Sequence, residues 1–464
     1  MTAAVHKRKT FLFLITPRIF HAMKKNYLTI TLLFFLILLP RLLNSAFFPY
    51  LMYEKQLANR MRIVVIPMRN AQYVSFATLV MVGSRNEIDQ GYTGYAHLLE
   101  HMMFRGSENF TTEDRVRIMY RYGGDSNAYT GMDYTCYTVR CDPEGWKDIL
   151  HMEADRLMRL SIKEDDYKAE TGAVIGEFGI SENYPSTMMS NRLRTCMFSG
   201  HTYEHSVIGY KQDVMKMPSG HAFIREFYEK NYTPEKTVLF IAGKIDKPGD
   251  VLTEAEILFS EWVYKQTPLI PIPHSLKSVH CTDTLYHSSV PSALLKIAWK
   301  IPGYEQDSKG HMSAAILAEH YFSESSPLIA KLRDEKKWIS KSSYSAPLTI
   351  DPFWISLDLT LTDDGKNARI PDFINGFLLD SRYQMSESDL RTIRDRYFYR
   401  TSLRMESPAS VLNILADYSH VTGDPQELNR FFLNLDRLEL YDIRDFKNKH
   451  MIKNNQSYVW MLKP

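Results

Sequence analysis

The stretch GYAHLLEHMMF, residues 94–104, places two histidines and a glutamate within five consecutive positions. His97, Glu100 and His101 stand at i, i+3 and i+4, so a helix would carry them on one face. Two histidines one turn apart can direct ring nitrogens at one metal ion, and a glutamate beside them can take a proton from water. The alternative is an ordinary polar helix surface. The flanking leucines and methionines imply partial burial, where unpaired histidine and glutamate are costly, so the pattern predicts a metal site.

A third ligand has to come from another segment, because a catalytic zinc ion takes three protein ligands and leaves one position open. In KAETGAVIGEFGISEN, residues 168–183, Glu170 and Glu177 are seven residues apart, which is two helical turns along one face. A glutamate on a helix is solvated far more often than it binds a metal. Spacing alone therefore does not select Glu177 as the ligand.

Several motifs together resemble one family of enzymes. HLLEH, followed about 75 residues later by E-x-x-x-V-I-x-E, resembles the pitrilysin/insulinase family of zinc peptidases, which carry the inverted motif HxxEH. The resemblance is strong over about residues 55–250 and thinner beyond. Its other segments are YGGDSNAYTGMDYTCYTV (122–139), MFSGHTYEHSVIGY (197–210), FYEKNYTPEKTVLFIAGKID (227–246) and SPLIAKLRDEKKW (326–338).

The resemblance implies a role for each matching residue of the motif. It implies that His97, His101 and Glu177 bind one zinc ion per chain and that Glu100 is the general base. It also implies that Glu170 orients a ligand histidine. The implied fold is α+β: two duplicated α/β-sandwich domains of the mitochondrial-processing-peptidase type, each a mostly antiparallel sheet covered by helices.

The resemblance also implies how a substrate is held. Asn127, Ala128 and Tyr129 would bind an extended peptide as an added strand, although an ordinary strand with a polar edge explains the same residues. In the family's second domain an arginine and a tyrosine seven residues later contact the substrate. Arg333 matches that arginine, but serine stands at position 340 and the nearest tyrosine is Tyr344.

The serine at position 340 and a second departure from the family's pattern favour a partner subunit. The family's HPYGxP stretch is also altered, with Thr202, Glu204 and Ser206 where proline, glycine and proline are usual. We expect a dimer with a related subunit that lacks the zinc motif and supplies the missing substrate contacts; a homodimer is the alternative.

The chain divides into four predicted regions. Residues 1–46 read as a targeting segment, 47–262 as the zinc-bearing domain, 263–278 as a proline-rich linker and 279–464 as a second homologous domain. In the second domain a strand at 293–301 followed by a helix at 311–322 repeats the order of the first, and ILAEH (316–320) echoes the opening motif with isoleucine in place of the first histidine. Together they indicate a duplication that lost the metal site, although chance similarity explains the five-residue echo taken alone.

Periodicity predicts the elements around the motifs. Residues 126–140 read as one bent strand, and a capping-box-like start at Thr111 predicts a helix that stops at Gly123. The remaining expected elements are strands at 61–68, 73–83 and 293–301, and helices at 143–160, 165–182 and 311–322.

The N-terminal segment predicts export. Lys24 and Lys25 precede an apolar run from Leu28 to Leu39, which suits a signal-peptide core, and translation then starts at Met23. We expect a periplasmic protein of a bacterium; an uncleaved membrane anchor is the alternative. The first 46 residues hold seven Lys/Arg and no acid, which leaves 49 basic against 54 acidic residues in the rest. This slightly acidic balance does not indicate the clustered basic surface that binds nucleic acid.

Four cysteines, Cys136, Cys141, Cys196 and Cys281, occur without a CxxC spacing. Cys136 and Cys141 are five residues apart in a strand-like run and would point to opposite faces, so they pair poorly. We expect the cysteines to be small buried residues rather than disulfide partners.

The predicted function is a zinc metalloendopeptidase that hydrolyses extended peptides or unfolded protein segments, as the catalytic subunit of a two-subunit enzyme. A non-catalytic scaffold subunit of the same fold is one alternative. A lyase like S-ribosylhomocysteine lyase, which also uses HxxEH, is another, but chain length, duplication and the Glu170/Glu177 helix argue against it.

Overall fold

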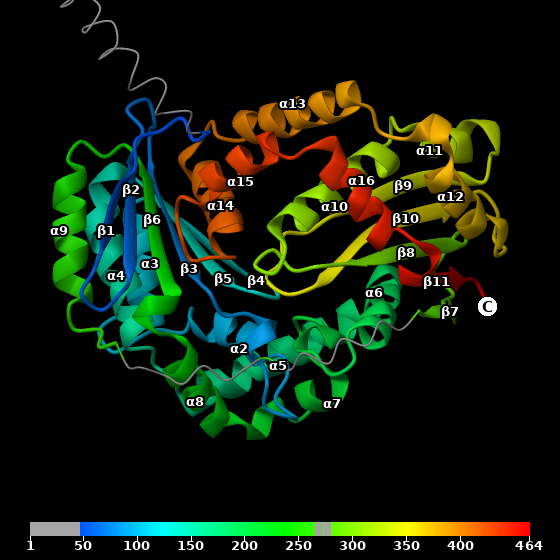
Figure 1. Cartoon of the computed structure of the whole chain (residues 1–464). Coiled ribbons are helices and arrows are strands. Elements are labelled where there is room, and N and C mark those ends of the chain that lie inside the picture. Colours follow the sequence, from blue (N-terminus) through cyan, green and yellow to red (C-terminus); the bar gives the residue numbers. More distant parts are fainter. Residues whose placement is uncertain (1–46, 265–271, 273–279) are drawn as a thin grey trace, which may run out of the picture. The chain divides into compact units, whose positions relative to one another are not determined.

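The computed structural model describes residues 47–264, 272 and 280–464, which form two β-sheets covered by helices (Figure 1). The first sheet has the strand order β1-β2-β6-β3-β5-β4, and β2 and β6 are its one parallel pair. Every residue of β3 and β6 is buried, as expected of strands covered on both faces. Its strands are β1 (Tyr53–Gln56), β2 (Arg62–Pro67), β3 (Val74–Val80), β4 (Asp125–Thr130), β5 (Thr135–Cys141) and β6 (Thr237–Gly243).

The second sheet repeats the topology of the first. Its order is β7-β11-β8-β10-β9, which reproduces β2-β6-β3-β5-β4 position by position, and β11 is parallel to β7 as β6 is parallel to β2. The predicted duplication is therefore confirmed. The strands are β7 (Thr282–Tyr286), β8 (Leu294–Ile301), β9 (Ile339–Ser345), β10 (Phe353–Leu361) and β11 (Gln456–Leu462).

The two halves exchange one helix each. Helix α6 (Pro185–Met197) follows the first half's strands in sequence but packs on β8 and β11, and α14 (Pro408–Ser419) packs on β3, β5 and β6 (Figure 1). Met189 and Leu193 of α6 share a hydrophobic cluster with Val459 of β11. These contacts join the halves, and the described residues from Tyr50 onward form one compact unit.

Most predicted helices are confirmed. Helix α3 begins after Thr111, whose hydroxyl accepts the backbone N–H of Asp114 at 3.1 Å, and it ends at Arg121, before the predicted stop at Gly123. The other helices are α2 (Tyr95–Met102), α4 (Trp146–Met158), α5 (Glu164–Ser181), α7 (Lys211–Val214), α8 (His221–Asn231), α9 (Pro248–Phe259), α10 (Ser308–Phe322), α11 (Pro327–Ala330), α12 (Arg369–Leu379), α13 (Glu387–Leu403), α15 (Glu427–Asp436) and α16 (Leu440–His450).

The single bent strand predicted for residues 126–140 is wrong. The segment is a hairpin, β4 and β5, closed where the N–H of Gly131 donates to the carbonyl of Tyr134 at 2.7 Å. Asp133 in this turn is buried and accepts the backbone N–H of Ile350 at 3.1 Å and the hydroxyl of Tyr203. These partners are distant in sequence, so local propensity does not reveal the turn.

The expectation for the cysteines is half wrong. Cys136 and Cys141 are buried thiols, as predicted, but Cys196 of α6 and Cys281 beside β7 form a disulfide across 85 residues. The helix exchange brings them together, because α6 lies on the sheet that contains β7. The predicted targeting segment (1–46) lies outside the described residues, and so does most of the predicted linker (263–278). No helix in the described part of the chain has the length and apolar character to cross a membrane.

Candidate metal centre and active site

Helix α2, which carries both histidines, starts at a glycine. Gly94 has φ 88°, and a Cβ there would lie 2.4 Å from the carbonyl oxygen of Ile208, so only glycine fits without a shift. Glycine has no side chain to cap the helix, and Glu87 takes over that role. Its two carboxyl oxygens accept the N–H groups of Gly94 and Ala96, each at 2.7 Å. Burial raises the pKa of Glu87 to about 8, against the opposing effect of these donors. The start of α2 is therefore set by one buried carboxyl group.

His97 and His101 of α2 converge with Glu177 of α5. Glu177 Oε2 lies 3.7 Å from the Nε2 atom of each histidine, and one ligand atom from each residue lies within 4.8 Å of the others. Ligand atoms around a tetrahedral zinc ion are about 3.4 Å apart. The three donors therefore fit zinc after a small adjustment. Within the described ranges this is the one group of three such side chains close enough to share an ion.

Glu170 lies two helical turns before Glu177 on the same face of α5, and it holds His101 in place. Its Oε2 accepts the Nδ1–H of His101 at 2.8 Å, and its Oε1 accepts the guanidinium of Arg105. The bond to Nδ1 leaves Nε2, which faces Glu177, with its lone pair available for a metal. The same bond raises the pKa of His101 and lowers the pKa of Glu170. Burial lowers the pKa of His97, which favours the neutral form of that ring.

Glu100 projects from α2 toward the end of strand β4. Its Oε2 accepts the hydroxyl of Thr130, the last residue of β4, at 2.5 Å. Burial raises the pKa of Glu100, and the Thr130 bond opposes that effect. Glu100 and His101 both border a cavity of about 360 Å³, with Arg105 and Glu170 in the same wall. A carboxylate suited to proton transfer thus faces open space beside the metal-ligand set.

Strand β4 forms the outer edge of the first sheet. Among the described residues it pairs with β5 alone, so its other side is available to an added strand. Asn127 and Tyr129 are exposed and Ala128 is half-buried. The N–H of Ala128 donates to Asn127 Oδ1 at 2.9 Å. The three residues predicted to bind substrate therefore lie on an edge that leads directly to Glu100.

The structure does not bring Arg333 into this group. Arg333 lies in a π-helical turn, Lys331–Glu335, where it is half-buried and pairs with Asp334 at 3.0 Å. The hydroxyl of Tyr344 donates to Glu319, not toward the metal ligands. The substrate role predicted for Arg333 stays a prediction.

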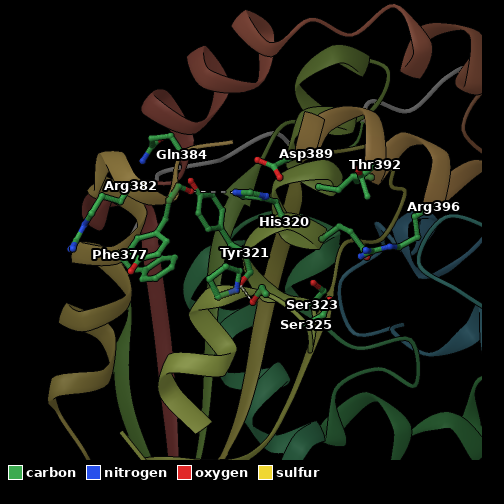
Figure 2. Close-up of a pocket in the computed structure, with 15 residues that line it drawn as sticks. His320, Tyr321, Ser323, Ser325, Phe377, Arg382, Gln384, Asp389, Thr392 and Arg396 are labelled. Carbon is green, nitrogen blue, oxygen red and sulfur yellow. Dashed lines mark hydrogen bonds and ion pairs between the residues drawn. The ribbon is translucent and has the colours of Figure 1, made fainter. Parts of the chain in front are cut away.

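The second half holds a segment that corresponds to the metal centre of the first half but does not carry the set of three ligands. Glu319 of α10 corresponds to Glu100 and is 3% exposed. Arg396 and Arg400 of α13, which stands where α5 stands in the first half, bond its carboxylate at 2.8 and 3.3 Å. Figure 2 shows the adjoining cavity of about 260 Å³, in which His320 is bonded to the carbonyl of Tyr383 at 3.3 Å. Two guanidinium cations therefore lie against the buried glutamate of the second half.

Three residues of the site were missed in the sequence. Arg105 follows His101 by four residues, so helical spacing could have suggested it. Glu87 and Thr130 carry no such signal, because their contacts with α2 depend on how loops and strands fold back.

Comparison with known families agrees with this geometry. Residues 62–211 match the family described as insulinase (peptidase family M16), and residues 221–397 match the family described as the peptidase M16 inactive domain. A zinc protease of Helicobacter pylori, PqqE, is 24% identical over 417 residues, which is 88% of this chain and 92% of that protein. An uncharacterized zinc protease of Mycobacterium tuberculosis is 29% identical over 46% of this chain and 48% of its own length.

Solved structures share the fold. The crystal structure of a protease from Helicobacter pylori superposes with a TM-score of 0.80 at 22% identity, covering 90% of this chain and 100% of that one. Pitrilysin superposes with a TM-score of 0.74 at 17% identity over 89% of this chain and 45% of its own. A peptidase M16 inactive domain from Pseudomonas fluorescens gives 0.75 at 14% identity, with 89% and 98% covered.

Proposed function

Because the chain belongs to the insulinase (M16) family of zinc proteases, we propose that it is an active endopeptidase that hydrolyses extended peptides or unfolded protein segments. The observation that carries the proposal is the convergence of His97, His101 and Glu177 beside Glu100. Family members without activity are expected to have lost part of this set, and here all four side chains are present and close.

In this mechanism His97, His101 and Glu177 hold one zinc ion, which when bound polarises the scissile carbonyl and acidifies a water molecule. Glu100 takes the proton of the attacking water and returns it to the leaving amine nitrogen. Its partial burial favours this role, because a raised pKa makes the carboxylate a better base. Glu170 keeps His101 in the correct tautomer and orientation.

The substrate is held as an extra strand along β4. Backbone bonds to residues 127–129 supply affinity whatever the side chains are, which suits a peptidase for extended or unfolded segments. The bond between Glu100 and Thr130 supports a position of the reacting peptide bond near the end of β4.

A related subunit supplies substrate contacts that this chain lacks. Serine stands at position 340, and Tyr344, the nearest tyrosine, is engaged with Glu319. Two exposed apolar side chains lie at the end of α5, Ile180 within the helix and Tyr184 just after it, and they suit a contact with such a partner. We also propose export to the periplasm, which the Cys196–Cys281 disulfide supports, since such bonds persist in oxidising compartments.

Zinc analysis and cleavage of a quenched fluorescent peptide test the proposal together. Glu100→Gln is expected to bind zinc normally and to lose at least about 10³-fold in kcat, since the general base is removed. His97→Ala is expected to lose both zinc and activity, and a chelator abolishes the wild-type activity until zinc is restored. Glu113→Gln, on the exposed first turn of α3, is the matched control.

Zinc binding without cleavage would contradict an independently active enzyme. The same assay with the related subunit added then separates a two-subunit peptidase from a scaffold: activity that Glu100→Gln abolishes supports the former, and continued inactivity supports the latter.

A further inference from the structure

The inward face of helix α3 carries an arginine where an apolar residue is usual. Arg115 is the one buried residue of α3, with 5% of its surface exposed. Its guanidinium lies over the ring of Phe104, 5.4 Å from the ring centroid. Arginine is almost never buried to this extent unless its charge is paired. The surroundings of Arg115 therefore have to account for that charge.

A second buried arginine packs against the same ring. Arg156 of α4 is 1% exposed, and its guanidinium lies 5.7 Å from the ring centroid of Phe104 and 4.7 Å from that of Tyr137. Burial and repulsion from Arg156 lower the pKa of Arg115 to about 10, against the opposing effect of Glu153. Because that pKa is still far above neutrality, both guanidinium groups remain charged. Two like charges thus lie close together in the interior.

One carboxylate stands against these two cations. Glu153 of α4 is fully buried and pairs with Arg156. In the described part of the chain no acidic side chain forms an ion pair with Arg115. The next acid of α4, Asp155, bonds the side chain of Asn109 at 2.7 Å. The cluster of Arg115, Arg156 and Glu153 therefore holds one positive charge in excess, which is costly away from water.

The same two arginines hold buried donors. Arg115 Nη1 and Arg156 Nε and Nη1 find no acceptor among the described residues. Water could accept these N–H groups but would leave the excess charge in place, whereas an anion accepts them and also neutralises the charge. The depth of both guanidinium groups keeps out the carboxylate of a peptide or of another protein. A single excess charge at such depth suits a small monovalent anion.

The cluster lies behind a wall of the active-site cavity. Phe104, on which both guanidinium groups pack, borders the cavity of about 360 Å³ together with Glu100 and His101. An anion beside the two arginines would reduce the repulsion between the groups that support this ring. The position of Phe104 then depends on the compensation of charge behind it.

We propose that Arg115 and Arg156 bind one halide ion, chloride under ordinary conditions, in the interior between α3 and α4. The ion supplies the missing negative charge and accepts hydrogen bonds from both guanidinium groups. It stabilises the fold around Phe104, and this role does not require the protein to be an active peptidase.

Thermal unfolding of the zinc-loaded protein tests the site. Chloride is varied at constant ionic strength against gluconate, an anion too large for so deep a position. Because a ligand that binds only the folded state stabilises it with the logarithm of its concentration, we expect Tm to rise by about 1–2 °C for each tenfold increase in chloride near saturation. Arg115→Met removes the excess charge and should abolish this rise. Arg117→Met, at a side chain of α3 that is 69% exposed, should keep it.

Bromide locates the ion directly and needs no variant. Crystals of the wild-type protein grown with bromide in place of chloride are expected to show an anomalous peak within hydrogen-bond distance of Arg115 and Arg156. The absence of a peak there would overturn the proposal and leave water as the partner of both arginines, and this result decides if Arg115→Met does not fold. A Tm that responds equally to chloride in the wild type and in a folded Arg115→Met would overturn it as well.

Discussion

At the scale of single residues, Glu87 acts on the metal centre through the backbone of α2. Its carboxylate bonds the N–H groups of Gly94 and Ala96, directly before His97, and it is 4% exposed. Because a misplacement of about 1 Å can strongly reduce turnover, the start of this helix matters for activity. Glu87 is thus a positioning residue: it acts through α2, not on substrate.

We predict that Glu87→Ala lowers the free energy of unfolding by about 1–3 kcal/mol, the range for leaving buried donors unpaired. It should also weaken zinc binding, because the first turn of α2 loses its cap. Urea unfolding and zinc titration measure the two effects, and Glu87→Gln, which keeps one acceptor, should recover part of each. Unchanged zinc affinity in Glu87→Ala would contradict the positioning role.

His205 makes stability depend on pH. Burial lowers its pKa to about 4, below the value of about 6.5 in an unfolded chain. Between pH 6.5 and 4 this histidine therefore binds more protons in the unfolded state than in the folded state, so its own contribution to stability falls as the pH is lowered. The expected loss across this window is at most about 3 kcal/mol.

Urea unfolding at pH 7.5 and pH 5 measures this dependence. His205→Gln should remove this contribution from the measured slope. An equal slope in the wild type and in His205→Gln would assign the pH effect to other groups.

At the scale of elements, the α10–α13 pair shows what replaces the metal in the second half. In the first half two histidines and a glutamate fit one divalent cation. In the second half Glu319 is buried and bonds Arg396 and Arg400. In the second half two guanidinium groups hold α10 and α13 together, whereas in the first half the proposed metal ion would hold α2 and α5 together and leave an open position for chemistry.

We predict that Arg396→Met destabilises the protein by about 1–3 kcal/mol, less than for a fully buried pair because the arginine is 43% exposed. The double variant Arg396→Met/Glu319→Gln should be less destabilised, since the uncompensated buried charge is also removed. Urea unfolding measures both, and Arg391→Met, exposed on the same helix, is the control. If the double variant lost as much free energy of unfolding as the two single variants together, this account would be contradicted.

At the scale of the whole molecule, the disulfide between α6 and β7 reinforces the helix exchange. It closes a loop of 85 residues that crosses from the first half to the second. A cross-link over such a loop stabilises a folded chain by about 4 kcal/mol in the chain-entropy account.

A reductant should therefore lower the free energy of unfolding of the wild type by about that amount. The variant Cys196→Ser/Cys281→Ser should be insensitive to reductant, and Cys141→Ser, at a free buried thiol, should remain sensitive. Thermal unfolding with and without reductant is the measurement. A wild type indifferent to reductant would mean that the halves are held by packing alone.

Much of the architecture could be predicted because it depends on local patterns and a repeated order of elements. The spacing of His97, Glu100 and His101 predicts their common helix face, and the echo at 316–320 predicts the second copy. The hairpin at 126–140 and the disulfide could not be predicted, because Asp133 and Cys196 find their partners in the other half.

The sequence by itself determined the chemistry: which side chains can bind zinc, which can act as a base, and that the second copy lacks this set. The tertiary structure decided what these residues meet. It brought α5 against α2, placed Thr130 against Glu100, capped α2 with Glu87 and exchanged α6 for α14 between the sheets. The physical reason is that spacing along a helix fixes a shared face, whereas contacts between distant segments depend on how all the buried surfaces pack together.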